Sequence, residues 1–124
     1  MAGTILIVDD ERDVVDLLVY NLQKAGYKTL TAFDGREALE KAHQEAPHVI
    51  VTDESLPLLT GTQLAKTLKS EGSTIPILLV TGYRSGLDTS CCNAVLGKPI
   101  EVDELVKTVF LVLAGPATEE HAVP

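Results

Sequence analysis

Short, wholly apolar runs alternate with longer segments in which apolar residues recur every three or four positions, over nearly the whole chain. Continuous apolar runs are typical of strands buried on both faces, whereas the wider spacing is typical of helices with one buried side. The expected strands are 5–8, 27–31, 49–51, 75–80 and 95–96, and the expected helices are 13–24, 34–46, 60–71 and 102–113. This alternation predicts an α/β fold, with a doubly wound parallel sheet covered by helices on both faces.

The connection between the fourth and fifth expected strands differs from the others. Residues 81–92 include two glycines and several short polar residues, with few apolar positions. Such a composition favours a loop or a single turn over an amphipathic helix. We therefore expect the helix of this crossover to be shortened or missing.

Chain length and the last stop signal predict a single domain followed by a short tail. The 124 residues are enough for one hydrophobic core without a disulfide or a structural metal. Gly115 and Pro116 end the last expected helix. We therefore assign residues 1–115 to the domain and residues 116–124 to a disordered tail.

Charge, hydropathy and cysteine usage limit the partners and the location. Acidic residues outnumber basic ones by 18 to 10, for a formal net charge of −8, whereas a nucleic-acid partner would require a basic surface. No apolar run reaches membrane-spanning length, and no basic leader opens the sequence. Cys91 and Cys92 are adjacent, which suits free thiols better than a disulfide or a metal site. We expect a cytoplasmic protein with no nucleic-acid or membrane partner.

Five polar side chains follow expected strands at the point where each strand ends. They are Asp9 and Asp10 after the first strand, Asp53 after the third, Thr81 after the fourth and Lys98 after the fifth. The carboxyl ends of parallel strands meet at one edge of an open sheet, and functional residues gather there. Three carboxylates, a hydroxyl and an ammonium at one edge predict a site for a divalent cation and a phosphoryl group.

The three aspartates supply the oxygen ligands that a hard cation prefers, and Mg²⁺ is the candidate. Asp10 would bind the metal directly, and Asp9 would bind it directly or through water. Asp53 and the backbone carbonyl of Ser55 would complete the protein ligands. Without a cation, three neighbouring carboxylates would repel one another and raise the pKa of at least one.

The remaining groups suit phosphoryl transfer. Asp53 is the candidate nucleophile, because an aspartate carboxylate can attack phosphorus when nearby cations neutralise the phosphoryl oxygens. Lys98 would pair with one phosphoryl oxygen, and the Thr81 hydroxyl would donate a hydrogen bond to another.

Four motifs together resemble the receiver domain of two-component response regulators. They are Ile-Leu-Ile-Val-Asp-Asp-Glu at 5–11, Asp-Glu-Ser-Leu-Pro-Leu-Leu-Thr-Gly at 53–61, Val-Thr-Gly at 80–82 and Lys-Pro at 98–99. The resemblance covers the chain from Thr4 to Ala114. It implies a flavodoxin-like five-stranded sheet in the order 2-1-3-4-5 and a cis peptide between Lys98 and Pro99. It also implies Mg²⁺-dependent phosphoryl transfer from a histidine kinase onto Asp53, in a signalling switch rather than an enzyme.

Two departures from the family pattern concern the route from phosphorylation to output. In that family the Thr81-type hydroxyl moves inward on phosphorylation, and an aromatic residue usually stands where this chain has Val95. Thr81 and Lys98 are also only 17 positions apart, from 81 to 98, which is fewer than usual. These features resemble a receiver subgroup named for a Phe-Ala-Thr-Gly-Tyr type motif, associated with kinases of the HWE or HisKA2 type. Tyr83 is then either a replacement switch residue or a loop tyrosine packed over apolar neighbours.

Three functional hypotheses follow. The leading one is a receiver that accepts a phosphoryl group on Asp53 and then changes its partner-binding surface. The second keeps the fold but makes it an interaction module that binds its partner regardless of phosphorylation. The third, a phosphatase of the haloacid dehalogenase type, needs an Asp-x-Asp arrangement that Val8-Asp9-Asp10 does not provide.

Overall fold

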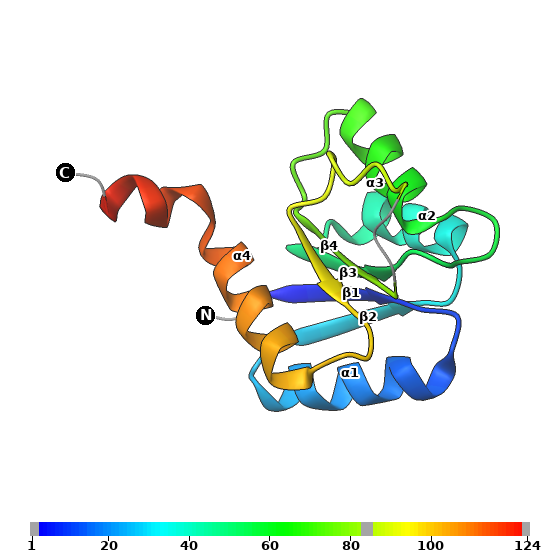
Figure 1. Ribbon diagram of the computed structural model, residues 1–124, viewed down its shortest axis with the longest axis horizontal. Coiled ribbons are helices and arrows are strands. Elements are labelled where there is room, and N and C mark those ends of the chain that lie inside the picture. Colours follow the sequence, from blue (N-terminus) through cyan, green and yellow to red (C-terminus); the bar gives the residue numbers. More distant parts are fainter. Residues whose placement is uncertain (1–2, 83–85, 123–124) are drawn as a thin grey trace.

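Five parallel strands form a single sheet with helices on both faces (Figure 1). The structure, a computed structural model, describes residues 3–82 and 86–122, with side chains described up to residue 115. The elements in chain order are β1 (Thr4–Val8), α1 (Arg12–Lys24), β2 (Lys28–Ala32), α2 (Gly35–Glu45), β3 (Val49–Asp53), α3 (Gly61–Ser70), β4 (Ile77–Thr81), β5 (Ala94–Gly97) and α4 (Val102–Ala122). The predicted α/β class is confirmed.

The strand order is β2-β1-β3-β4-β5, and all four neighbouring pairs are parallel. This confirms the order that the family resemblance implies. The order reverses direction at β1 and β3, so the carboxyl ends of these two strands form the switch point of the sheet. The register sets Val8 opposite Thr52 and Asp53 opposite Val80. The residues that follow β1 therefore lie beside the end of β3.

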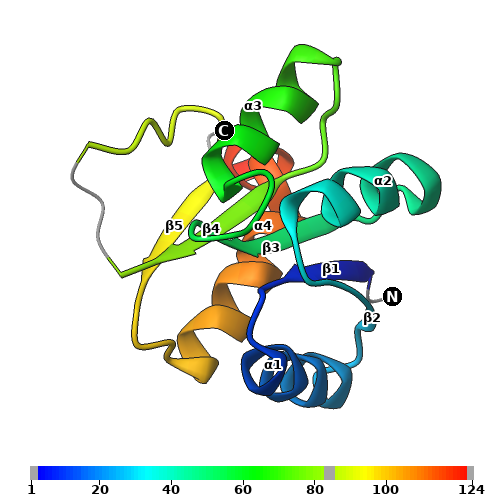
Figure 2. The ribbon, with the colours of Figure 1, turned by 90° about the vertical axis from the view of Figure 1, so that its right-hand side faces the viewer.

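Alternate residues of each strand enter two separate hydrophobic layers. On one face Ile5 and Ile7 pack with residues of α1 and α4, and on the other Leu6 and Val8 pack with residues of α2 and α3. Figure 2 shows these helices on the two sides of the sheet. Both faces are buried, so the strands read as continuous apolar runs instead of alternating ones.

Side-chain caps fix the starts of α2 and α3, where backbone N–H groups lack helical partners. The Asp34 carboxylate accepts a hydrogen bond from the N–H of Glu37 at 2.7 Å. The Glu37 carboxylate accepts from the N–H of Phe33, one residue earlier than a capping box would have it. Thr60 and Gln63 form a full capping box at α3. Both helices thus begin within one residue of their predicted starts.

The β4–β5 link, residues 82–93, contains no helix in its described part, as its composition predicts. A turn within it is closed by the N–H of Cys92, which donates to the Thr89 carbonyl at 2.9 Å. Cys91 and Cys92 are free thiols, half-buried against the layer under α2 and α3. Burial raises the pKa of the Cys92 thiol to about 11, which keeps it protonated at neutral pH. Tyr83, the candidate switch residue, lies outside the described residues.

Helix α4 is interrupted at Gly115, whose φ of 67° and ψ of −173° are not helical. The break coincides with the predicted stop at this glycine, and helical backbone then continues to Ala122. The division into a domain at 1–115 and a disordered tail at 116–124 stays a prediction. None of the helices in the described chain combines the length and the apolar character needed to cross a membrane.

Candidate metal site at the sheet edge

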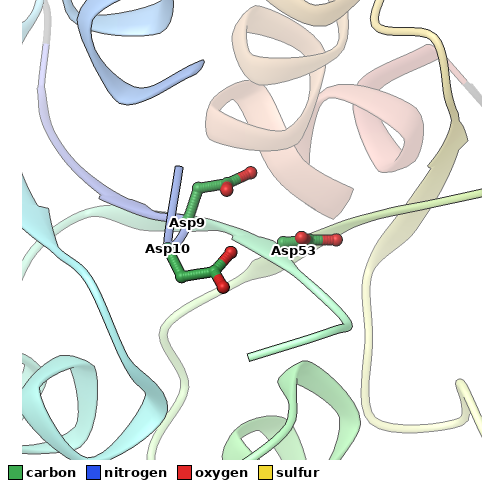
Figure 3. Close-up of side chains that lie close together, drawn as sticks. All are labelled: Asp9, Asp10 and Asp53. Atoms are coloured by element: carbon green, nitrogen blue, oxygen red, sulfur yellow. The ribbon is translucent and has the colours of Figure 1, made fainter. Parts of the chain in front are cut away.

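Three carboxylates meet at the switch point of the sheet (Figure 3). Asp9 and Asp10 directly follow β1, and Asp53 is the last residue of β3. One oxygen from each carboxylate can be chosen so that all three lie within 4.8 Å of one another. Asp9 and Asp53 are buried and Asp10 is exposed, so the cluster opens to solvent on one side. The structure therefore brings together the three aspartates that the sequence predicts as metal ligands.

Lys98 reaches the same edge from the end of β5. Its Nζ lies 3.1 Å from Oδ2 of Asp53, and its backbone N–H donates to the Thr81 carbonyl at 3.0 Å. The peptide bond between Lys98 and Pro99 is cis, as the family resemblance implies. Burial alone would lower the pKa of Lys98, but the hydrogen bond and the charge of Asp53 raise it overall. The side chain thus remains a cation beside the candidate nucleophile.

Thr81 is the last residue of β4 and is buried. In the register Thr81 lies opposite Gly97, the residue before Lys98. It also directly follows Val80, which lies opposite Asp53. Asp53 and Thr81 thus end β3 and β4, and Lys98 directly follows β5, so the three residues expected to handle a phosphoryl group lie at the carboxyl ends of three adjacent strands. Their side chains belong to one rim of the sheet.

The electrostatics of Asp9 favour a positive charge at this rim. Burial raises the pKa of Asp9 above its ordinary 3.8, and the charges of Asp53 and Asp10 raise it further. The N–H of Glu11, which donates to Asp9 Oδ1 at 2.9 Å, and the charge of Lys98 lower it only in part. A hard divalent cation would relieve this excess of negative charge, and carboxylate oxygens are the ligands that Mg²⁺ prefers. The donor set therefore fits such an ion.

Two further residues of the loop after β3 border the site. Ser55, predicted to offer its backbone carbonyl, is exposed two residues past Asp53, and its role as a ligand stays a prediction. Glu54, which sequence reasoning did not single out, is buried, and its carboxylate accepts hydrogen bonds from Thr62. An acidic residue placed directly after a buried strand was the available signal.

Comparison with known sequences places the chain in a family. The family model described as response regulator receiver domain matches residues 5–110. The alkaline phosphatase synthesis transcriptional regulatory protein PhoP of Bacillus subtilis is 42% identical over 110 residues, which are 89% of this chain and 44% of that protein. The chain thus spans less than half the length of this relative.

Solved structures agree with the sequence match. The receiver domain of the Francisella response regulator 1452 is 27% identical, with a TM-score of 0.85 over 90% of this chain and 97% of that one. TrrA of Thermotoga maritima, solved in complex with Mg²⁺-BeF, is 31% identical, with a TM-score of 0.83 over 90% of this chain and 99% of that one. The family match and the similarity to PhoP agree with the geometry of the rim. The chain therefore belongs to the response regulator receiver domains of two-component signalling systems.

Proposed function

We propose that this chain acts in the cytoplasm as a phosphorylatable receiver, which accepts a phosphoryl group from a histidine kinase on Asp53 with the help of Mg²⁺. The observation that carries the proposal is the setting of the Asp53 carboxylate. One of its oxygens contacts Lys98 Nζ at 3.1 Å, and the carboxylate shares the rim with those of Asp9 and Asp10. Membership of a two-component family makes a histidine kinase the partner class.

The proposed step is a displacement at phosphorus. An oxygen of Asp53 forms a bond to phosphorus as the P–N bond of the kinase phosphohistidine breaks, and the electron pair leaves on the imidazole nitrogen. Lys98 would move its contact from the carboxylate to a phosphoryl oxygen, and the Thr81 hydroxyl would donate to another. A bound divalent cation would neutralise charge on the phosphoryl oxygens.

The metal ligands belong to the same proposal. Asp10 and Asp53 would bind Mg²⁺ directly, Asp9 directly or through water, and Ser55 through its backbone carbonyl. The raised pKa of Asp9 and the cluster of carboxylate oxygens support this assignment. The Mg²⁺-BeF complex of the related TrrA supports the choice of ion.

The route from the site to a partner is the finer part of the proposal. We place the chain in the subgroup with a Phe-Ala-Thr-Gly-Tyr type motif, with Thr81 and Tyr83 as switch residues and a kinase of the HWE or HisKA2 type. Two observations support it: the described part of the β4–β5 link contains no helix, and Val95 lies in β5 at the usual aromatic position. Phosphorylation would then act through the link, whose surface differs from that of a receiver with a helix there.

Intact mass after incubation with phosphoramidate or acetyl phosphate tests the acceptor. The wild type should gain one phosphoryl group with Mg²⁺ and none with EDTA, and Asp53→Asn should gain none. Asp16→Asn, on the exposed side of α1, is the matched control and should be modified like the wild type. Equal modification of Asp53→Asn, or modification independent of metal, would refute the proposal.

A further inference from the structure

Glu54 is a buried carboxylate that the proposed reaction does not use. It directly follows Asp53, and 8% of the residue is exposed. No ion pair found among the described side chains involves it. Burying a carboxylate without compensating hydrogen bonds is costly. Its contacts therefore indicate what holds it in place.

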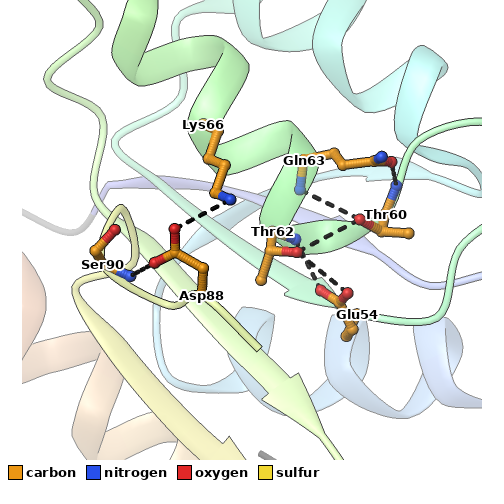
Figure 4. A network of polar contacts seen from close by, with 7 residues as sticks. All are labelled: Glu54, Thr60, Thr62, Gln63, Lys66, Asp88 and Ser90. Carbon is orange, nitrogen blue, oxygen red and sulfur yellow. Dashed lines mark hydrogen bonds and ion pairs between the residues drawn. The ribbon is translucent and has the colours of Figure 1, made fainter. Parts of the chain in front are cut away.

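Both carboxylate oxygens of Glu54 contact the start of α3 (Figure 4). Oε1 accepts from the N–H of Thr62 at 2.8 Å, and Oε2 accepts from the Thr62 hydroxyl at 3.2 Å. Thr62 is the second residue of α3, where backbone N–H groups lack helical partners and the helix dipole favours a negative charge. The side chain of Glu54 is thus anchored to the first turn of this helix.

The backbone of Glu54 is fixed as well. Its N–H donates to the Val80 carbonyl at 3.2 Å, and its carbonyl accepts from Leu56 at 3.0 Å and from Gly61 at 3.1 Å. The start of α3 also packs directly on Asp53, the residue before Glu54, since a Cβ added to Gly61 would lie 2.5 Å from the Asp53 carbonyl oxygen. Residues 53 and 54 therefore have little freedom relative to α3, and Ser55 lies between Glu54 and Leu56, whose backbones are hydrogen-bonded to each other.

We infer that Glu54 is a positioning residue for the metal site: its contacts with Thr62 hold the backbone of residues 53–55 so that the Asp53 carboxylate and the Ser55 carbonyl face one cation. This inference rests on the proposed function of that rim. Mg²⁺ demands near-ideal octahedral geometry at about 2.0–2.1 Å, so a small rotation of the backbone would misplace a ligand. Groups that orient metal ligands without touching the metal typically change affinity about 10–100-fold when removed.

Two simpler roles for Glu54 make different predictions. As a cap alone, it would affect the stability of the folded chain but not the affinity of the folded chain for Mg²⁺. As a charge alone, it would attract Mg²⁺ without any need for Thr62. Thr62→Val separates these roles, because it removes the hydroxyl contact and keeps every charge and the Thr62 N–H.

The test is the Mg²⁺ dissociation constant of the folded chain, measured by isothermal calorimetry. Glu54→Ala should weaken Mg²⁺ binding about 10-fold, and Thr62→Val should weaken it in the same direction by less. Glu54→Gln, whose amide oxygen can still accept from the Thr62 N–H, should lie between Glu54→Ala and the wild type. The Glu54→Ala/Thr62→Val double variant should be no weaker than Glu54→Ala alone. Glu40→Gln, exposed on α2, removes one charge elsewhere and should match the wild type.

A kinetic readout gives a second measure. The Mg²⁺ concentration for half-maximal phosphorylation by phosphoramidate should rise in the Glu54 and Thr62 variants, while the rate at saturating Mg²⁺ stays near that of the wild type. If Glu54→Ala does not fold, Thr62→Val still tests the inference, because the Glu54 carboxylate can still accept from the backbone N–H at position 62 and cap the helix.

Three results would overturn the inference. Wild-type affinity in Thr62→Val, with equal losses in Glu54→Ala and Glu54→Gln, would show a charge effect only. Wild-type affinity in all variants, with lowered melting temperatures, would show a cap only, and the proposed phosphorylation of Asp53 would stand. A wild-type chain that binds no Mg²⁺ would remove both the inference and the metal-dependent function.

Discussion

Two loops leave the rim of the sheet, one after Asp53 and one after Thr81, and different kinds of contact hold them to the helices. The β3–α3 loop, residues 54–60, is held by the buried carboxylate of Glu54, and its Pro57 carbonyl accepts from the N–H of the buried Gly35 at 3.2 Å. The middle of the β4–β5 link is tied to α3 by the ion pair of Lys66 and Asp88 (3.1 Å), whose side chains are about half exposed (Figure 4). Nearer β5, the half-buried Cys91 and Cys92 pack against the layer under α2 and α3.

This difference indicates which loop stays fixed and which one responds. Breaking a buried hydrogen bond leaves a desolvated polar group without a partner, which costs about 1–3 kcal/mol, whereas an exposed ion pair contributes little and is screened by salt. Loops with few buried contacts also open at lower free energy than the elements around them. The β3–α3 loop suits a site that needs constant geometry, and the link suits the surface that would change in the proposed switch through Thr81.

Alanine at Gly35 should have the largest effect. A Cβ there would lie 1.9 Å from the Leu59 carbonyl oxygen and 2.5 Å from the Leu59 Cβ, so the start of α2 and the β3–α3 loop would have to separate. Overpacking of this kind costs about 1–3 kcal/mol and occasionally more, and a backbone atom cannot move aside as a flexible side chain would. We expect a loss of about 3 kcal/mol in the free energy of unfolding, measured with urea.

Gly82→Ala is the counterpart in the link. A Cβ at Gly82 meets no atom of the described residues within 4 Å, and the expected change in the free energy of unfolding is below about 0.5 kcal/mol. Gly86 is unsuitable as a control, because its φ of 80° would strain any side chain. Equal losses at Gly35 and Gly82 would contradict the comparison between the two loops.

Asp9 at the rim and Asp88 in the link should also respond to pH in opposite directions, with the larger effect at Asp9. Burial raises its pKa above 3.8, so the stabilising effect of its protonation is complete below pH 3.8 and is lost as the pH rises through the folded-state pKa. Asp9→Asn keeps an oxygen for the Glu11 N–H and removes the charge. In EDTA at pH 7 it should be about 1 kcal/mol more stable than the wild type, and the gain should shrink towards pH 4.

Added Mg²⁺ supplies the control for this prediction. At a Mg²⁺ concentration of about 100 Kd, the wild type should gain about 2.7 kcal/mol in unfolding free energy. The Asp9→Asn variant should gain less, because it has lost a carboxylate of the site. A variant that is less stable than the wild type in EDTA would show that Asp9 stabilises the fold directly instead of holding charge for a cation.

Much of this rim could be predicted because it depends on local rules. An apolar run sets each strand, and the residue after it must lie at the carboxyl edge, so the meeting of Asp9 and Asp53 requires only that β1 and β3 be neighbours. The close approach of Gly35 to Leu59 and the capping of Thr62 by Glu54 depend instead on how separate crossover units pack. No periodicity in the sequence encodes such a contact.

Element boundaries show the same limit. The fourth strand was predicted at 75–80 and lies at Ile77–Thr81. Its apolar run includes Ile75, but the first pair with β3 is Ile77 with Ile50, whose N–H donates to the Pro76 carbonyl at 3.0 Å. Pairing with the neighbouring strand, and not the apolar run, decides where β4 starts.

Asp88 in the link should show the smallest effect on stability and a clear effect on titration. Hydrogen bonds from Ser90, followed by the contact with Lys66, lower its pKa from 3.8 to about 2. A lowered pKa stabilises the folded chain above pH 3.8, and this contribution is lost as the pH falls through about 2. Since Ser90 is the larger cause, Lys66→Met should raise the carboxyl pKa, followed by NMR, only part of the way towards 3.8, and Ser90→Ala should raise it further.

Added salt should separate the two causes of the lowered pKa of Asp88, the ion pair with Lys66 and the hydrogen bonds from Ser90. At about 1 M NaCl the Debye length is about 3 Å, so the contribution of Lys66 should fade while the short contacts within the Asp88–Ser90 turn persist. The urea midpoint of Lys66→Met at pH 7 should stay within error of the wild type, because both side chains of the pair are about half exposed. A loss approaching that of Gly35→Ala would mean that the link is held as firmly as the β3–α3 loop, and phosphorylation would then need another route outward from Thr81.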